Sequence, residues 1–243
     1  MMKDKNTTTL TKVLNVVASI IFGISLVVCS VIGGFATFAT DADYYREVQS
    51  GLGVTPSRIG LSSEENMMIA NESLADYMAG RIDDMQVIVT NYGAEQPLWS
   101  SQAISHMKDV RDLVQLWSTI AIVLVVYMVG YIVYRVRDKS GRLKLCSDVV
   151  STYCIVGIVI GIIAVSVLVF GFNDVFVIFH KLFFSNNDWL FAPSDLIVRL
   201  LPEKFFLTMA VRGGITVLSV VAITLISAII YRKVANRQID KKD

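Results

Sequence analysis

The stretch LVQLWSTIAIVLVVYMVGYIVY, which runs from Leu113 to Tyr134, contains 22 residues without a charged side chain. A helix needs about 20 predominantly apolar residues to cross the hydrocarbon core of a bilayer. Three further stretches have the same character, and most of their polar residues are Ser and Thr, which can hydrogen-bond within their own helix. With 54% hydrophobic residues and a mean hydropathy of +0.58, the 243-residue chain is not an ordinary soluble domain. We therefore expect a mainly α protein with four transmembrane helices, at residues 13–40, 113–134, 149–172 and 205–231.

The charged residues are divided unequally between the segments that connect these helices. The N-terminal segment, the loop after the second helix and the C-terminal tail together hold 13 Lys and Arg against 5 Asp and Glu. Residues 41–112 and 173–212 on the other side hold 9 against 16, although the net charge of the chain is only +1. Short basic segments remain in the cytoplasm, so we expect both termini inside and both longer connections outside. The expected segments are a cytoplasmic tail (1–12), an extracytoplasmic cap (41–112), a basic cytoplasmic loop (135–148), an extracytoplasmic interfacial segment (173–204) and a cytoplasmic tail (232–243).

Several classes of protein and site are disfavoured by the same residues. The first apolar stretch exceeds the roughly 7–15 apolar residues of a secretory signal, so we expect an uncleaved anchor. The basic clusters are interpreted as topology signals and not as nucleic-acid-binding patches. Cys29 and Cys154 lie in predicted spans and Cys146 at a cytoplasmic helix end, so we expect neither a disulfide nor a thiol nucleophile on the outer side.

The first outer connection has the signals of a small α+β cap. Ser62 followed by Glu65 resembles a capping box that begins a helix, and Gly80 suits its C-terminal end. The segments 85–90 and 95–99 flank an Asn-Tyr-Gly turn and predict a short hairpin. Ser100 and Ser101 then predict the start of a helix that continues into the second span.

The second outer connection is unusually apolar for a loop. Residues 175–184 are too apolar for open water and too few to span the bilayer, which is typical of an interfacial or re-entrant helix. Asn186, Asn187 and Asp188 predict a turn after this segment, and Pro202 predicts the boundary of the last span.

The only two histidines, His106 and His180, are both expected at the outer face. His106 shares a helix face with Asp109, which can orient its ring, and the helix N-terminus favours the neutral imidazole. His180 stands among phenylalanines, where a buried imidazole requires a partner. For His106 the alternative is an interfacial histidine that makes a capping bond, and for the segment around His180 it is plain membrane anchoring. Arg212, near the outer end of the last span, is a third polar candidate, and its alternative is a side chain that snorkels to the lipid headgroups. No zinc motif or phosphate-binding loop is present in the sequence.

The residues around both histidines resemble two signatures of the bacterial lipoprotein intramolecular transacylase (Lit) family, and the layout of spans agrees. The first signature is matched by Ser101, Ser105, His106, Met107, Asp109 and Val110, followed directly by a span. The second is matched by Phe179, His180, Phe183, Phe184, Asn186, Trp189, Asp195, Ile197, Pro202, Glu203 and Phe205.

This resemblance implies an acyl transfer at the outer face of the bacterial cell membrane. The substrate would be a diacylated lipoprotein, whose sn-2 acyl chain moves from the diacylglyceryl group to the α-amine of the same cysteine. The α-amine is itself a nucleophile, so neither a covalent acyl-enzyme nor a metal or cofactor is expected. His106 would be the general base and His180 would polarise the ester or protonate the leaving oxygen, and these roles can be reversed.

The resemblance also implies a wider site around the two histidines. Asp109 would orient His106, and Arg111 or Arg212 would add positive potential. The expected substrate-binding residues are Phe179, Phe183, Trp189 and Arg212.

Two other functions remain open on the sequence. A non-catalytic four-span scaffold would bind a partner through its acidic cap. A lipid-ester hydrolase would use Ser101 or Ser105 near His106. The sequence gives no indication of the oligomeric state.

Overall fold

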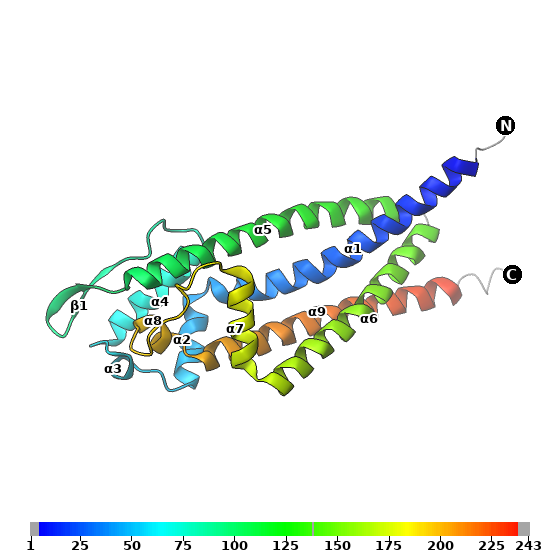
Figure 1. The fold of residues 1–243 in the computed structure, drawn as a ribbon. Helices are drawn as coiled ribbons and strands as arrows, with labels where there is room; N and C mark the ends of the chain where they lie inside the picture. Colours follow the sequence, from blue (N-terminus) through cyan, green and yellow to red (C-terminus); the bar gives the residue numbers. More distant parts are fainter. Residues whose placement is uncertain (1–4, 138, 238–243) are drawn as a thin grey trace. The chain divides into compact units, whose positions relative to one another are not determined.

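The computed structural model describes residues 5–137 and 139–237, and this part of the chain is mainly helical with one small sheet (Figure 1). The chain divides into two compact units. Unit 1 comprises Met1–Ile32, Ser118–Ala164 and Thr216–Asp243, and unit 2 comprises Gly33–Trp117 and Val165–Ile215. The elements are α1 (Lys5–Ala39), α2 (Ala42–Gly51), α3 (Pro56–Ile59), α4 (Glu64–Met78), β1 (Ile88–Asn91), β2 (Ala94–Pro97), α5 (Ser101–Arg135), α6 (Lys139–Phe170), α7 (Phe172–Phe183), α8 (Leu196–Leu200) and α9 (Glu203–Arg237).

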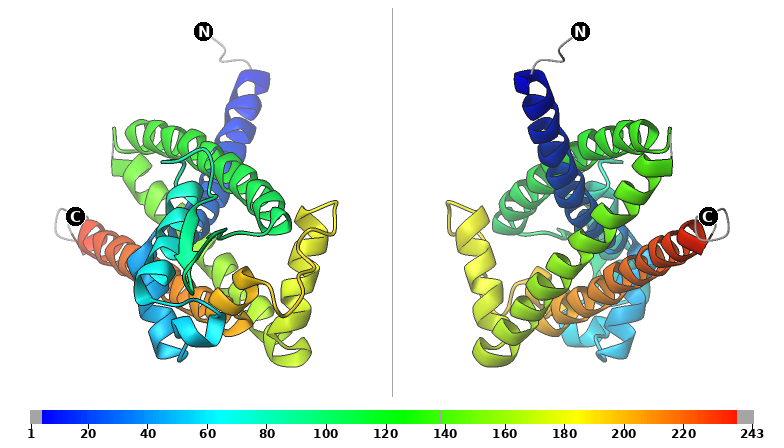
Figure 2. Two further views of the ribbon diagram at one scale, coloured as in Figure 1. Left: turned by 90° about the vertical axis from the view of Figure 1, so that its left-hand side faces the viewer. Right: turned by 90° about the vertical axis from the view of Figure 1, so that its right-hand side faces the viewer.

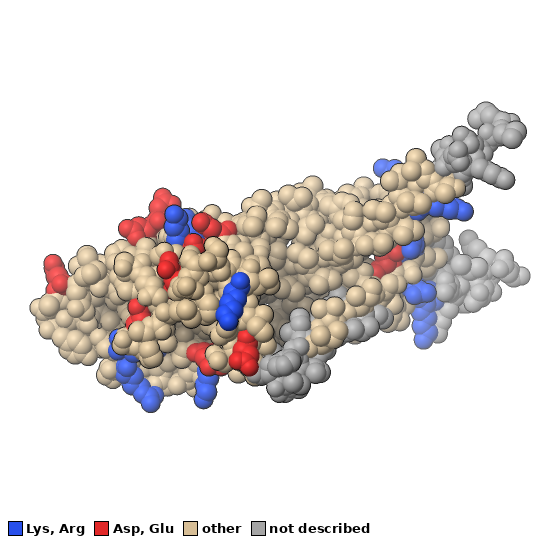
Figure 3. Space-filling model, in the orientation of Figure 1, with Lys and Arg blue, Asp and Glu red and all other residues tan. Residues whose placement is uncertain are grey.

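Three helices in the described part of the chain are long and apolar enough to cross a membrane. They are Thr9–Ala36, Ser101–Arg135 and Glu203–Val234, with mean hydropathies of 2.6, 2.2 and 2.4. The third predicted span, 149–172, falls in α6, where many side chains lie outside the described residues. Figure 3 shows a largely uncharged surface along the middle of the long helices, whereas charged side chains lie towards their ends and around the short helices.

Unit 1 contains a buried carboxylate, Asp148 of α6, surrounded by hydrogen-bond donors. Its Oδ2 accepts from the hydroxyls of Tyr131 and Ser19, at 2.5 and 3.2 Å, and its Oδ1 lies 2.8 Å from Lys144 Nζ. Arg135 Nε donates to the Tyr131 hydroxyl at 2.9 Å. Paired and hydrogen-bonded in this way, the buried charge links α1, α5 and α6.

Unit 2 is built around a core of short helices and the hairpin (Figure 2, left). In it α2 packs on α4, α3 packs on α4 and α8, and α4 contacts β1. Leu74, Met85 and Phe205 are among its fully buried side chains. Burial of side chains of this size contributes about 1.5–3 kcal/mol each to the stability of such a core.

Two buried amides connect three of these helices. Gln49 of α2 donates to Asn71 of α4 at 2.8 Å and accepts from it at 2.7 Å. Gln49 Nε2 also donates to the carbonyl of Leu200 in α8 at 3.2 Å. Since Gln49 and Asn71 are both 0% exposed, these bonds satisfy polar groups that water does not reach.

Two details of the cap differ from the sequence-based prediction. The N-cap of α4 is Ser63, whose side chain accepts from Asn66 N, so the predicted capping box of Ser62 and Glu65 is wrong by one residue. The strands are shorter than predicted because the side chain of Gln86 pairs with the backbone of Trp99 and replaces ladder bonds at that end.

The predicted hairpin is present, and its turn is two residues long. Asn91 pairs with Ala94 across a two-residue loop, Tyr92-Gly93, and both loop residues have positive φ, at 50° and 84°. Such a turn matches the right-handed twist of the two strands.

Candidate functional site

His106 lies near the start of α5 and is 6% exposed. The helix begins as predicted, since Ser100 Oγ accepts from Ala103 N at 3.1 Å. At about 1.5 Å per residue, the 35 residues of α5 exceed the thickness of a bilayer core. Four charged residues between Lys108 and Asp112 separate His106 from the uncharged stretch Leu113–Tyr134 of the same helix.

His180 lies in the last turn of α7 and is 7% exposed. Its Nδ1 is 2.7 Å from the carbonyl oxygen of Phe176. Because a carbonyl only accepts, Nδ1 carries the hydrogen and the lone pair of the neutral ring is on Nε2. The Phe176 and Trp189 rings pack beside the imidazole, with centroids 4.2 and 5.2 Å away.

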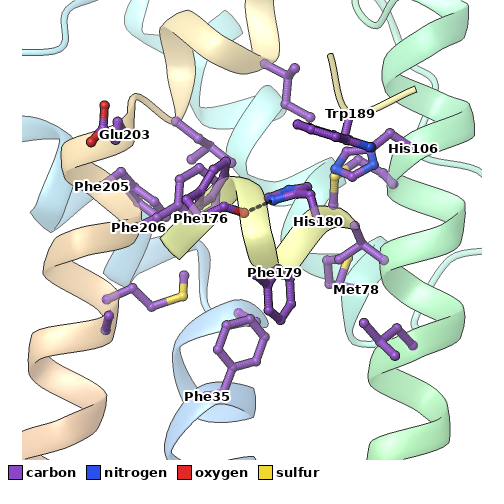
Figure 4. A pocket seen from close by; sticks show the side chains of 18 of the residues that line it. Phe35, Met78, His106, Phe176, Phe179, His180, Trp189, Glu203, Phe205 and Phe206 are labelled. Carbon is purple, nitrogen blue, oxygen red and sulfur yellow. Dashed lines mark hydrogen bonds between the residues drawn. The ribbon is translucent and has the colours of Figure 1, made fainter. Parts of the chain in front are cut away.

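The two imidazoles lie side by side, although 74 residues separate them in the chain. Their ring centroids are 5.7 Å apart and their planes differ by 31° (Figure 4). Phe184 packs against both, at 5.2 Å from His106 and 5.5 Å from His180. Groups this close can act on one small reacting centre, directly or through one water.

Both rings are held in the neutral form at pH 7. The pKa of His106 is lowered to about 4, chiefly by burial and then by the nearby His180, while Asp109 and Asp188 oppose the change. Burial also lowers the pKa of His180, while the hydrogen bond to the Phe176 carbonyl raises it in part. Among the described residues His106 Nδ1 is buried without a hydrogen-bond partner, so this ring keeps an uncommitted polar atom.

A cavity of about 450 Å³ adjoins the two imidazoles (Figure 4). Its walls are apolar, and Glu203 is the one Asp, Glu, Lys or Arg among its lining residues. A cavity of this kind favours hydrocarbon chains, and a small number of polar groups fixes the orientation of the ligand. The aromatic residues of the lining include Phe35, Trp117, Phe172, Phe176, Phe179, Phe184, Trp189, Phe191, Phe205 and Phe206.

The loop after α7 is bound to α5 by hydrogen bonds that the sequence-based reasoning missed. Asn186 Nδ2 donates to Asp109 Oδ2 at 2.7 Å, and Ser105 Oγ donates to Asp188 Oδ2 at 2.6 Å. Gln102 Nε2 donates to the Asp188 carbonyl at 3.0 Å. The available signal was the spacing of Gln102, Ser105 and Asp109, which places three polar side chains on one helix face.

The predicted supporting residues, Asp109 and Arg111, are bonded to groups other than the two histidines. Asp109 accepts from Asn186, and among the described residues no hydrogen bond joins it to His106. Arg111 stacks on the Tyr77 ring, 4.5 Å from its centroid, and approaches Asp83 at 3.4 Å. Arg111 is not among the residues that line the cavity.

The predicted substrate-binding residues divide into two groups. Phe179 and Trp189 line the cavity. Phe183 packs against Trp117 at 5.5 Å and is partly exposed, and it is not among the lining residues. Arg212 pairs with Glu47 at 2.8 Å and lowers the pKa of that carboxyl, and it does not line the cavity either.

Within residues 5–137 and 139–237, no group of three His, Cys, Asp or Glu side chains is arranged to hold a metal ion. Cys29 and Cys146 are free thiols.

Comparison with known proteins identifies a family over most of the chain. The sequence profile described as lipoprotein intramolecular transacylase Lit matches residues 5–206. No curated protein sequence matches the chain.

Solved structures of one membrane-integral protein share the fold. The lipoprotein intramolecular transacylase Lit from Bacillus cereus superposes with a TM-score of 0.68 at 17% identity, covering 94% of this chain and 98% of that one. A variant of it with a histidine-to-arginine change gives 0.69 at 16% identity, covering 98% and 99%. At this identity the likeness establishes the fold alone.

Proposed function

Because the chain belongs to the lipoprotein intramolecular transacylase family, and is a membrane enzyme, we propose that it moves an acyl chain within one lipoprotein molecule. The substrate is a lipoprotein whose N-terminal cysteine carries a diacylglyceryl group and a free α-amine. The sn-2 acyl chain moves to that amine, which leaves an N-acylated, lyso-form lipoprotein. The observation that carries the proposal is the pair of neutral imidazoles, 5.7 Å apart, beside an apolar cavity of about 450 Å³.

His180 is the general base in this proposal, which reverses the roles first expected from the sequence. Its Nδ1–H is held by the Phe176 carbonyl, so the basic Nε2 has a fixed orientation, as a proton acceptor requires. The same bond strengthens its basicity, whereas the pKa of His106 falls to about 4. His106 is therefore the weaker base of the pair.

The reaction then proceeds without an external acid or a covalent acyl-enzyme. The neutral amine nitrogen forms a bond to the ester carbonyl carbon, and His180 Nε2 takes the proton that this nitrogen loses. When the carbon–oxygen bond to the glycerol breaks, the protonated His180 returns that proton to the departing oxygen. The products are an amide and a free sn-2 hydroxyl, and the enzyme regains its starting state.

His106 stabilises the oxyanion that forms between these two steps. A neutral imidazole offers one N–H, and in a water-poor site such a donor stabilises developing negative charge far more than in water. His106 Nδ1 is buried without a hydrogen-bond partner among the described residues. This supports a role in which the substrate supplies a hydrogen-bond partner to the ring. Holding the amine and the ester together also raises the rate, because effective molarities of about 10⁵ M or more are possible.

The apolar cavity binds the acyl chains, with Phe179 and Trp189 among its walls. We assign Phe183, Arg111 and Arg212 to packing and ion pairs of unit 2, because none of them is among the lining residues. Ser105, the candidate nucleophile of a hydrolase, donates its hydroxyl hydrogen to Asp188. That bond favours a structural role for this serine over a nucleophilic one.

We also propose the membrane arrangement expected from the charges. Four helices span the bilayer at 13–40, 113–134, 149–172 and 205–231, with both termini in the cytoplasm. The segments 41–112 and 173–204 are then extracytoplasmic, and the second of these is interfacial. The 32-residue length of α6 supports a fourth span, because about 20 residues suffice to cross the core.

The first prediction concerns the product and the two histidines. Expression of the protein in cells that make diacylated lipoproteins should leave the mass of the lipidated N-terminal peptide unchanged, with one acyl chain moved from glycerol to nitrogen. His180→Ala should lower the rate about 10²–10⁴-fold, and His106→Ala about 10²–10³-fold. Tandem mass spectrometry of the purified peptides measures both the transfer and its loss.

Tyr92→Ala, at the exposed tip of the hairpin, is the matched control and should transfer at the wild-type rate. A peptide that loses the mass of one acyl chain would instead identify a hydrolase. A peptide unchanged in every respect would favour a scaffold, and full activity of either histidine variant would disprove the mechanism.

A further inference from the structure

The distance between the two imidazoles is set by a loop and a helix that are far apart in the sequence. His106 belongs to α5, whereas His180 lies in the last turn of α7, with three residues between it and the segment 184–195. The last backbone bond of α7 runs from Phe184 N to the His180 carbonyl, at 2.9 Å, so the first residue of this loop is bonded to the histidine. Whatever fixes the loop on α5 therefore fixes His180 relative to His106.

The bonds that do so lie on both sides of His106 along α5. Gln102 and Ser105 precede it and Asp109 follows it by three residues, so all lie on or next to the helix face that carries the histidine. Asp109 accepts from Asn186 at 2.7 Å, and Ser105 donates to Asp188 at 2.6 Å. Bonds with an ionised partner are about twice as strong as neutral ones, which suits them to this task.

The loop also carries rings that pack on the imidazoles. Trp189 donates its Nε1–H to the Asn186 carbonyl at 3.0 Å, and its ring lies 5.2 Å from that of His180. Phe191 lies 5.5 Å from the ring of His106. Displacement of the loop would therefore change the packing around both imidazoles.

We infer that Asp109 and Asn186 are positioning residues for the proposed transfer, and that their hydrogen bond holds the loop beside His106 so that both imidazoles meet one substrate. The inference rests on the proposed function for its effect on rate, while the bond itself can be tested without substrate. A misplacement of 1 Å can lower a rate about 100-fold, so loss of the bond lowers kcat more than it raises KM.

An exchange of the two side chains separates this role from a direct effect of the Asp109 charge on His106. Asp109→Asn leaves two amides, which can still form a neutral hydrogen bond, whereas Asn186→Asp places two carboxylates together and removes the donor–acceptor match. The double variant D109N/N186D restores it, with the amide on α5 and the carboxylate on the loop. The carboxylate at 186 can still accept from Asp188 N, as Asn186 Oδ1 does at 3.1 Å.

The expected result is that Asn186→Ala lowers kcat about 10- to 100-fold at nearly constant KM, with the pH profile unmoved because both histidines and Asp109 are retained. The double variant should recover to within about threefold of the wild type. Asp112→Asn, an exposed carboxylate on the same helix, is the control and should keep the wild-type kcat. Wild-type kcat in Asn186→Ala, or no recovery in the double variant, would overturn the inference.

Hydrogen exchange of the peptide that covers 185–195 provides the readout that needs no activity. Exchange should be faster than in the wild type for Asn186→Ala and Asn186→Asp, and should slow again in the double variant. A protein that transfers no acyl chain would disprove the proposed function, and the exchange pattern would still decide whether the bond holds the loop. Equal exchange rates in the wild type and all variants would overturn the inference that this hydrogen bond holds the loop.

Discussion

At the scale of single residues, the two imidazoles differ in what fixes their hydrogens. His180 has one nitrogen committed to the carbonyl of Phe176, so its tautomer is determined by its own helix. His106 has a buried nitrogen with no partner in the described part of the chain, and it packs against Phe184 and Phe191. The two imidazoles therefore differ in their chemistry. The backbone orients His180, whereas a nitrogen of His106 is left to bond a group of the substrate.

Burial of His106 makes the fold sensitive to acid. Its pKa is about 4 in the folded protein against 6.5 for the free side chain, so below pH 6.5 the unfolded chain takes up a proton that the folded one does not. The stability contributed by this neutral ring is present above pH 6.5 and is lost as the pH falls towards 4, up to about 3 kcal/mol. His106→Phe, which keeps a ring and cannot bind a proton, should lose less stability on acidification.

Thermal unfolding in bicelles at pH 7 and pH 5 measures this difference. The melting temperature of the wild type should fall more than that of His106→Phe between the two conditions. Tyr92→Ala should keep the acid sensitivity of the wild type, and an equal fall in all three proteins would contradict the burial of the imidazole.

At the scale of elements, apolar runs and turn residues predicted the long helices and the hairpin turn, because hydropathy and local backbone preferences act over short distances. Residue patterns also placed a helix start at Ser100. They did not reveal that Asp109 binds Asn186, because a polar side chain on a helix face is compatible with many partners. Nor did they reveal the ion pairs of Arg111 with Asp83 and of Arg212 with Glu47, since only the folded chain shows which carboxylate each arginine meets.

The amide pair of unit 2 provides a prediction at this scale. Asn71→Ala would leave the side chain of Gln49 buried with one partner fewer, and a buried polar group left unsatisfied costs about 1–3 kcal/mol. Glu72→Ala, on the exposed side of the same helix, should change stability by less than about 0.5 kcal/mol. Chemical or thermal unfolding compares the two variants, and an Asn71→Ala protein as stable as Glu72→Ala would contradict a structural role for the pair.

At the scale of the whole molecule, the proposed chemistry belongs to one unit and the basic segments to the other. Both histidines, the cavity lining and the loop bonded to α5 fall within Gly33–Trp117 and Val165–Ile215. The basic cluster that includes Arg135 and Arg142 falls within unit 1. This partition agrees with a protein whose cytoplasmic side sets its orientation and whose outer side carries out the reaction.

Labelling of single cysteines decides the orientation. Tyr92→Cys at the exposed hairpin tip and Ser140→Cys at the exposed start of α6 are introduced into a chain in which Cys29, Cys146 and Cys154 are replaced by Ala. A membrane-impermeant maleimide should react with the first in intact cells and with the second only after permeabilisation. The reason is the charge difference, 13 Lys and Arg against 5 acidic residues on the proposed inner side and 9 against 16 in residues 41–112 and 173–212. Labelling of Ser140→Cys from outside in intact cells would reverse the topology and place both imidazoles on the cytoplasmic side, where the proposed lipoprotein substrate is not exposed.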